Sequence, residues 1–265
     1  MISNKYSKLN TFCKEFLNAK PFPYLVLDNF FEKKFFYKIT NELNNKKLIT
    51  KADKFDTIVE KNKSINRNVH LPYSIKKILH RLSEPDWVQN LKKLSGIIDL
   101  EPDKTDDQTI SNFHEMSNGG FLGSHVDHSN HPKNASKHVL NIILYLSNDW
   151  ESAYGGNTLL FNKYGKKVKE VIEYKPNRMI IFLHTPYSFH GVDELNPRKN
   201  KVRKTLYLDY YSNLRNPYFH INLPFKNHFF RHGTTFILQN RSEYFKPSNF
   251  YYTKTLLKYK INKYI

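Results

Sequence analysis

A series of short, regularly spaced strand patterns in the second half of the chain most limits the folds that it can adopt. Turn residues bound these patterns at Gly119-Gly120, Gly155-Gly156 and Lys175-Pro176-Asn177. The strands are expected at Thr109–Met116, Phe121–Asp127, His138–Leu146, Thr158–Phe161, Val168–Ile172, Met179–Leu183 and Lys204–Tyr211. Short strands at this spacing are typical of a sandwich or jelly roll. We therefore predict a mostly β fold with added helices.

The segment before these strands is predicted to be mainly helical. Apolar residues recur at helical spacing over Glu32–Leu43, and two shorter helices are expected at Tyr73–Leu82 and Trp87–Leu94. One short buried strand is expected at Tyr24–Asp28. The Lys- and Asn-rich piece Asn44–Asn68 has no clear period, so we predict a loop or a variable insertion there.

No internal repeat or low-complexity linker divides the sequence, so we predict one domain over residues 1–265. It would comprise a helical N-terminal part (1–107), a jelly-roll core (about 108–211) and a C-terminal extension (212–265). The extension carries aromatic clusters and a basic end, and we expect either a helical cover or a partly ordered tail. Hydrophobic residues make up 39% of the chain, which is enough to build a sizeable core.

Composition limits the partners and the location. A net charge of +18 would ordinarily suggest nucleic acid or an anionic surface as a partner. Most of the basic residues are lysines spread over every segment, as expected of solvated faces and of AT-rich coding, so we do not expect a nucleic-acid partner.

The single cysteine, Cys13, cannot form an intramolecular disulfide, and neither a signal peptide nor a membrane-spanning apolar run is recognisable. These features predict a cytoplasmic protein without a membrane span, and they leave the oligomeric state open.

The strongest candidate metal-binding motif is His125-Val126-Asp127. On a strand, residues two apart project from the same face, so this imidazole and this carboxylate would lie side by side. His190 follows the predicted strand Met179–Leu183 at a distance typical of the return strand in a jelly roll. Two histidines and one carboxylate on one face of an iron leave three positions open for other ligands. We therefore predict that His125, Asp127 and His190 bind a metal.

Arg203 and Thr205 form a candidate carboxylate anchor at the start of the last predicted strand. A guanidinium offers a rigid fork that matches a carboxylate, and a hydroxyl two residues on would add a second donor on the same face. The alternative is an ordinary surface arginine in a salt bridge. The position of Arg203 shortly after His190 favours the carboxylate anchor.

Further short motifs surround these residues. They are Phe113-His114-Glu115, Gly119-Gly120-Phe121-Leu122, His125-Val126-Asp127-His128, Asn141-Ile142-Ile143-Leu144-Tyr145-Leu146, Asp149-Trp150, Gly155-Gly156, Asn177-Arg178-Met179-Ile180-Ile181-Phe182, His190-Gly191-Val192 and Arg203-Lys204-Thr205-Leu206. Together they resemble the prolyl-hydroxylase-like branch of the iron(II)/2-oxoglutarate-dependent dioxygenase superfamily. The resemblance covers roughly Trp87–Tyr211.

The resemblance implies a double-stranded β-helix core of the jelly-roll or cupin-like type, and it implies Fe(2+), 2-oxoglutarate and O2 as cofactor and cosubstrates. It also implies that His125, Asp127 and His190 bind the iron, while Arg203 and Thr205 hold the distal carboxylate of 2-oxoglutarate. The implied reaction is hydroxylation of an unactivated carbon, with 2-oxoglutarate converted to succinate. The superfamily's halogenases have a small residue in place of Asp127, so its presence favours a hydroxylase.

Other polar residues near the motifs have less definite roles. His114 is a candidate cosubstrate contact, and it could equally be a buried hydrogen-bonding histidine. Asn141 and Tyr145 either line the pocket or pack within a strand. His128, His131 and His138 flank the first motif and are expected in mobile loops or at the substrate rather than as ligands. His184, at the end of a strand, is expected to be structural.

The motifs leave the substrate open between a small-molecule, sugar or amino-acid-like compound and a protein side chain such as proline. Loops Ser129–Lys137 and Asn148–Tyr154 could close over a small substrate, whereas a peptide would need an open groove. Nucleic-acid demethylation has less support, because Asp209 stands where DNA-repair dioxygenases carry a second arginine. A non-enzymatic cupin-like metal-binding protein is the last alternative, and the presence of every expected ligand argues against it.

Overall fold

A computed structural model describes residues 1–44, 52–66, 71–103, 112–198, 201–221 and 233–264. The strands are β1 (Tyr24–Leu27), β2 (Ala52–Phe55), β3 (Glu60–Asn66), β4 (Glu101–Pro102), β5 (Asn112–Val126), β6 (Lys137–Tyr145), β7 (Thr158–Phe161), β8 (Val168–Ile172), β9 (Met179–Leu183), β10 (His190–Val192), β11 (Arg203–Ser212) and β12 (Thr235–Phe236). The α-helices are α1 (Cys13–Asn18), α2 (Lys33–Leu43), α3 (Tyr73–Arg81), α4 (Pro85–Ser95) and α5 (Phe250–Tyr264).

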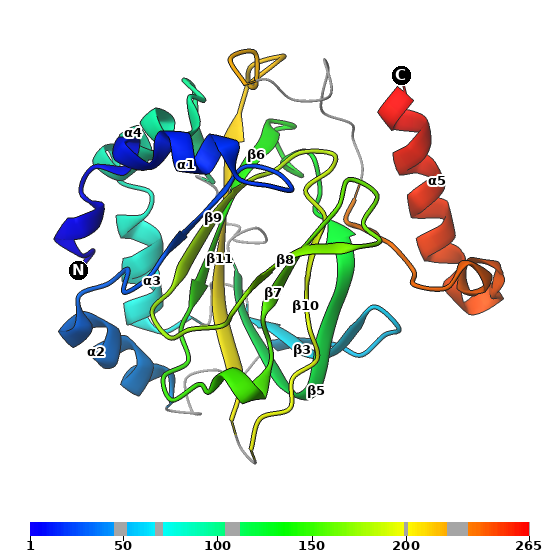
Figure 1. Ribbon diagram of the computed structural model, residues 1–265, viewed down its shortest axis with the longest axis horizontal. Helices are drawn as coiled ribbons and strands as arrows, with labels where there is room; N and C mark the ends of the chain where they lie inside the picture. Colours follow the sequence, from blue (N-terminus) through cyan, green and yellow to red (C-terminus); the bar gives the residue numbers. More distant parts are fainter. Residues whose placement is uncertain (45–51, 67–70, 104–111, 199–200, 222–232, 265) are drawn as a thin grey trace.

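The strands form one antiparallel sheet that curls over on itself (Figure 1). Its main path runs β1-β9-β6-β11-β5-β10-β7-β8, and the hairpin β2–β3 and the short strands β4 and β12 pair at its sides. Helices α1 to α4 lie on one side of the curled sheet, and α5 lies on the other. The predicted mostly β fold with a jelly-roll core and added helices is confirmed. Within the described residues, no helix is both long and apolar enough to span a bilayer.

β5 is the strand that connects the two layers of the curled sheet. Its first half pairs with β11 and its second half pairs with β10, which sets His125 directly opposite His190. Between the two halves, residues 117–120 bulge out opposite a single residue of β3. Gly119 in this bulge has a φ of 71°, in the left-handed region that favours glycine.

The two strands predicted around Gly119-Gly120 are therefore two halves of one strand. The glycine pair forms a bulge that keeps the strand continuous, where a tight turn was predicted. The predicted start of the first strand at Thr109 lies outside the described residues.

Alternation along β6 and β11 gives the sheet two different faces. Leu140, Ile142 and Leu144 of β6 join Leu206, Leu208 and Tyr210 of β11 in the cluster that contains the helix side chains. Ile143 and Tyr145 instead belong to the cluster between the layers, with residues of β7, β8 and β10. Since strand side chains alternate, Arg203, Thr205, Tyr207 and Asp209 project into the space between the layers.

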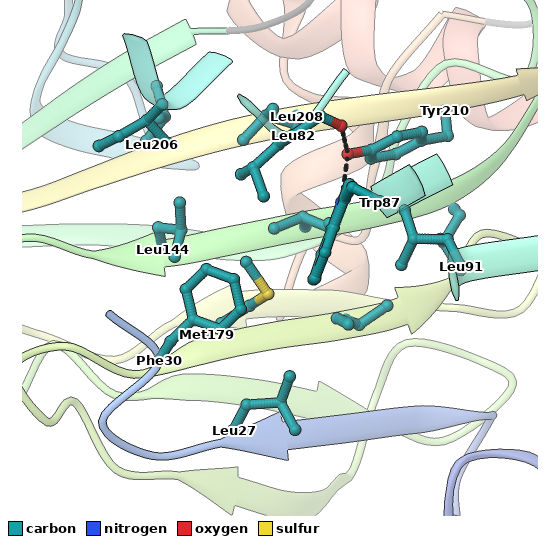
Figure 2. Packing of buried hydrophobic residues seen from close by; sticks show 14 of the residues in the cluster. Leu27, Phe30, Leu82, Trp87, Leu91, Leu144, Met179, Leu206, Leu208 and Tyr210 are labelled. Carbon is teal, nitrogen blue, oxygen red and sulfur yellow. Dashed lines mark hydrogen bonds between the residues drawn. The ribbon is translucent and has the colours of Figure 1, made fainter. Parts of the chain in front are cut away.

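The helical layer is fixed to the outer face of the sheet by apolar packing and by buried hydrogen bonds. Trp87 of α4 lies against Tyr210 of β11 (Figure 2), and both side chains are buried. Trp87 Nε1 donates to the Tyr210 hydroxyl at 3.1 Å, and that hydroxyl donates to the Leu82 carbonyl at 2.6 Å. The packing therefore orients β11, whose opposite face carries the predicted anchor.

The helices predicted in the first half are confirmed as α2, α3 and α4. The prediction of a loop over Asn44–Asn68 is wrong where the structure describes it, because β2 and β3 form a hairpin that pairs with β5. Residues 45–51 and 67–68 of that segment lie outside the described residues. The part predicted to be helical, 1–107, also contributes β1 and β4 to the sheet. That the whole chain forms one domain stays a prediction.

Replacing Tyr210 with Phe removes a hydroxyl that serves two buried groups. Trp87 Nε1 and the Leu82 carbonyl would both lose their partner. We expect Tyr210→Phe to lower the free energy of unfolding by about 1–3 kcal/mol, the usual cost of leaving buried polar groups unpaired. Urea unfolding measures this difference. Tyr73→Phe is the matched control, because Tyr73 is 77% exposed, and a loss of equal size in both variants would contradict the account.

Candidate functional site

Three side chains predicted as metal ligands meet where β5 pairs with β10. Asp127 follows β5, and its Oδ1 lies 3.4 Å from His125 Nε2. Its other oxygen, Oδ2, lies 3.4 Å from His190 Nε2. One ligand atom from each residue lies within 4.8 Å of the other two. The structure therefore brings together two imidazoles and one carboxylate that could hold a single metal ion.

Backbone carbonyls fix the orientation of both imidazoles. Nδ1 of His125 lies 2.8 Å from the Gly123 oxygen, and Nδ1 of His190 lies 3.0 Å from the Ser188 oxygen. A carbonyl oxygen only accepts hydrogen bonds, so each Nδ1 carries the proton and donates it. Each Nε2 is left with a lone pair that faces Asp127, as a metal ligand requires.

The protonation states of His190 and Asp127 also suit a metal. Burial, reinforced by the nearby His125, lowers the pKa of His190 to about 4. Burial opposes the charge on Asp127, but the adjacent His190 and His125 outweigh it, so the pKa of Asp127 lies well below its usual value. Near neutral pH, His190 is therefore neutral and Asp127 is ionised, which are the forms that bind metal ions.

Arg203 begins β11 with its side chain almost fully buried, at 1% exposure. Its Nε donates to the Gly156 carbonyl at 2.7 Å, and its Nη1 lies 3.4 Å from the Thr205 hydroxyl. Its Nη2 is buried and has no hydrogen-bond partner among the described residues. A buried cation with a free donor is costly, so this position calls for an anion.

Aromatic rings hold the Arg203 guanidinium in place. Its Cζ lies 5.4 Å from the ring centre of Tyr145 and 5.1 Å from that of Tyr174. Burial raises the pKa of Tyr145, which keeps its hydroxyl protonated, and that hydroxyl shares a 2.6 Å hydrogen bond with Thr158 Oγ1. The sequence left Tyr145 open between lining the pocket and packing within a strand. In the structure its ring lies against the guanidinium of the anchor.

His114 of β5 lies opposite Thr205 of β11 and lines the same cavity as His125 and Asp127. Its ring stacks on Tyr207 at 4.3 Å, and its Nε2 is buried with no hydrogen-bond partner among the described residues. Burial, then the positive charges of Lys63 and Arg203, lowers its pKa well below the usual value. His114 is therefore neutral and close to the anchor. Both predicted roles, a contact with the cosubstrate and a buried hydrogen-bonding histidine, stay predictions.

The cavity beside the metal ligands has a volume of about 460 Å³. Residues from four distant parts of the chain line it: Phe55, Glu60 and Lys63 of the β2–β3 hairpin, Tyr207 and Asp209 of β11, Phe236 of β12, and Tyr251 and Tyr252 of α5. Phe236 also packs on the His125 ring at 5.1 Å. No sequence signal marked these lining residues, since each comes from a segment outside the motifs or from a strand position without a motif of its own.

The other candidate histidines lie beyond the three ligands. His131 Nε2 lies 3.1 Å from Asp103, and the buried His184 stacks on His138 at 4.2 Å. His138 also lies 3.4 Å from Asp209, and with His128 it forms a second group of potential ligand atoms within 4.8 Å of one another. None of these four histidines belongs to the first group of ligand atoms among the described residues, and His138 lies in β6 rather than in a loop.

Comparison with known proteins finds one family model that matches part of the chain. Residues 111–209 match the family model of the 2OG-Fe(II) oxygenase superfamily. A search of the curated proteins finds no match to the sequence.

Solved structures share the fold at low identity. They include a prolyl-4-hydroxylase from Pseudomonas putida, with 14% identity, coverage of 77% of this chain and 99% of that one, and a TM-score of 0.55. A prolyl hydroxylase from Trichoplax adhaerens, in complex with a hypoxia inducible factor peptide fragment, has 16% identity, coverage of 78% and 90%, and a TM-score of 0.57. HygX from Streptomyces hygroscopicus, with nickel, 2-oxoglutarate and hygromycin B bound, has 8% identity, coverage of 80% and 88%, and a TM-score of 0.52. Identities this low show a common fold alone.

Gly156 is required where it contacts Arg203. Its φ is 75°, and a Cβ added there would lie 2.9 Å from Arg203 Cδ. We expect Gly156→Ala to lower the free energy of unfolding by about 1–3 kcal/mol, because a left-handed backbone and a close contact are then both strained. Chemical denaturation measures the change. Gly233→Ala is the control, since its Cβ would meet nothing within 4 Å, and an equally small effect at Gly156 would contradict the assigned strain.

Proposed function

We propose that the protein hydroxylates an unactivated carbon of a small-molecule, sugar or amino-acid-like substrate. The proposal starts from the match of residues 111–209 to the family model of the 2OG-Fe(II) oxygenase superfamily. Enzymes of this superfamily use Fe(2+), 2-oxoglutarate and O2. The observation that carries the proposal is the group of three metal-ligand side chains near a buried arginine that has a free donor.

His125, Asp127 and His190 would hold the iron. Their donor set fits Fe(2+), because two imidazoles and one carboxylate on one face leave three positions open. The backbone carbonyls at Gly123 and Ser188 keep both Nε2 atoms directed at the metal position. When bound there, the iron supplies the activation of O2 that couples the conversion of 2-oxoglutarate to succinate and CO2 with hydroxylation of the substrate.

Arg203 would bind the distal carboxylate of 2-oxoglutarate. The fit rests on its Nη2, which is buried without a partner among the described residues, and on the nearby Thr205 hydroxyl, which can add a second donor. The Gly156 carbonyl and the rings of Tyr145 and Tyr174 hold the guanidinium in one orientation. A rigid cation in a buried site binds a carboxylate strongly, because little conformational entropy is lost on binding.

The cavity supports a small substrate. Its volume of about 460 Å³ lies in the usual range of small-ligand pockets, roughly 300–1,000 Å³. The β2–β3 hairpin contributes Phe55, and α5 contributes Tyr251 and Tyr252, so elements from both ends of the chain bound the space next to the iron ligands. Polar and charged groups among these aromatic side chains, such as Glu60 and Asp209, suit a substrate with hydrogen-bonding groups.

A turnover screen tests the activity and the substrate class together. Iron-loaded protein is mixed with 2-oxoglutarate and each candidate substrate without oxygen, and succinate is measured after O2 is admitted. We expect succinate above the substrate-free rate with sugars, amino acids or related small molecules. Stimulation only by proline-containing peptides would replace the proposed substrate class with protein hydroxylation. No succinate in any mixture, from protein that binds iron, would contradict the proposed activity.

Replacing Arg203 tests the cosubstrate site. Loss of a buried, charge-assisted contact costs roughly 2–5 kcal/mol, and each 1.4 kcal/mol changes a dissociation constant about tenfold. We therefore expect Arg203→Ala to raise the Kd for 2-oxoglutarate by roughly 30-fold or more, with little change in iron binding. Isothermal titration of the anaerobic iron-loaded protein measures both. Arg215→Ala is the matched control, because Arg215 is exposed, and an unchanged Kd in Arg203→Ala would refute the assignment.

A further inference from the structure

We propose that His128, His138 and Asp209 form a second metal site, which holds a divalent transition metal on the wall of the cavity beside the iron ligands. The three residues come from three segments: His128 follows β5, His138 belongs to β6 and Asp209 belongs to β11. One ligand atom from each lies within 4.8 Å of the other two. This site goes beyond the proposed function, whose chemistry needs only the first group of ligands.

The spacing of the ligand atoms fits one ion. Asp209 Oδ1 lies 3.4 Å from His138 Nε2, and Asp209 Oδ2 lies 3.8 Å from His128 Nε2. Two atoms that each lie about 2.1 Å from a metal are about 3.4 Å apart at a tetrahedral angle. The corresponding distances from Asp127 in the first group are both 3.4 Å. Both distances from Asp209 in the second group thus lie within a few tenths of an ångström of the value that a shared metal requires.

His138 is oriented as a metal ligand. Its Nδ1 lies 3.0 Å from the His128 carbonyl oxygen, so Nδ1 donates and Nε2 presents its lone pair. This is the arrangement found at His125 and His190. Nε2 of His138 is buried and makes no hydrogen bond to the described residues, although it faces Asp209. The His184 ring, stacked 4.2 Å away at an interplanar angle of 8°, holds the imidazole in its plane.

A simple ion pair does not account for this geometry. A charge-assisted hydrogen bond between an imidazolium and a carboxylate closes to about 2.7–2.9 Å, especially when buried. His138 and Asp209 remain 3.4 Å apart although their side chains are 0% and 8% exposed. His128 Nε2 lies 3.8 Å from the other carboxylate oxygen and shares a 3.0 Å hydrogen bond with the Tyr211 hydroxyl, a partner that a metal at this position would replace. A metal ion between the three residues would account for the 3.4 Å separation of His138 and Asp209 and for the unpartnered His138 Nε2.

Asn141 separates the two groups of ligands. Its Nδ2 lies 3.1 Å from Asp127 Oδ2 and 3.4 Å from Asp209 Oδ1, so one amide donates toward both carboxylates. Each carboxylate is thereby kept at its own pair of histidines.

His128 and Asp209 line the cavity, so a metal held by them would keep open positions toward the substrate space. Those positions would accept water or an anionic group of the substrate.

Zinc titration tests the second site. We expect the metal-free protein to bind two equivalents of Zn(2+) in isothermal titration calorimetry. His128→Ala and the isosteric Asp209→Asn should each remove one equivalent, and His190→Ala should remove the other. The double variant His190→Ala/Asp209→Asn should bind none. His80→Ala is the matched control for loss of a histidine, because its side chain is 81% exposed and lies outside both groups, and it should keep both equivalents.

The possible results separate the second site from the first. One equivalent in the wild type, lost in His190→Ala and kept in Asp209→Asn, would overturn the second site and leave the iron ligands as proposed. A second equivalent that persists in both His128→Ala and Asp209→Asn would also overturn it, since the zinc would then be bound elsewhere. Circular dichroism confirms folding of each variant. His128→Ala is the safer substitution, because that side chain is 29% exposed.

Discussion

The pairing of β5 with two different partners is the constraint on which the rest of the structure depends. Its first half belongs to one layer of the sheet through β11, and its second half belongs to the other through β10. This arrangement sets His125 opposite His190 and directs Asp127 between them. The bulge at residues 117–120 lets one strand serve both layers, because it absorbs the extra residues without breaking the pairing with β3.

The same sheet supports the site by separating apolar from polar side chains on β11. Leu206, Leu208 and Tyr210 pack outward under the helices, while the alternate positions face inward. Buried groups such as Arg203 are expensive unless they are paired, so the outward packing must offset their cost. The Gly156 carbonyl and two tyrosine rings satisfy part of the guanidinium, and the remaining donor would give the site its proposed affinity for an anion.

Much of the fold and of the first ligand group could be predicted from the sequence, because short-range patterns encode them. The strands at Thr158–Phe161, Val168–Ile172 and Met179–Leu183 were predicted with their observed bounds, since apolar runs between turn residues are strong signals. β10, at three residues, is too short to produce such a pattern. The β2–β3 hairpin was missed because most positions of its strands are polar and the two buried ones, Lys63 and Asn66, are polar as well, so no apolar strand pattern marks it.

The site shows the same division between local and distant information. His125 and Asp127 lie two residues apart at the end of β5, so their proximity follows from the extended backbone there. The neighbourhood of His128, His138 and Asp209 depends on how three segments pack, and no spacing in the sequence encodes it. Tyr251 and Tyr252 of α5 likewise reach the cavity only through tertiary packing.

The most direct test of the account is a crystal structure of the protein grown without oxygen with Mn(2+) and 2-oxoglutarate. The account predicts an anomalous peak about 2.0–2.2 Å from His125 Nε2, His190 Nε2 and an oxygen of Asp127. It also predicts that the distal carboxylate of 2-oxoglutarate accepts hydrogen bonds from Arg203. The lack of any metal at these three ligands, or a 2-oxoglutarate whose distal carboxylate lies away from Arg203, would contradict it.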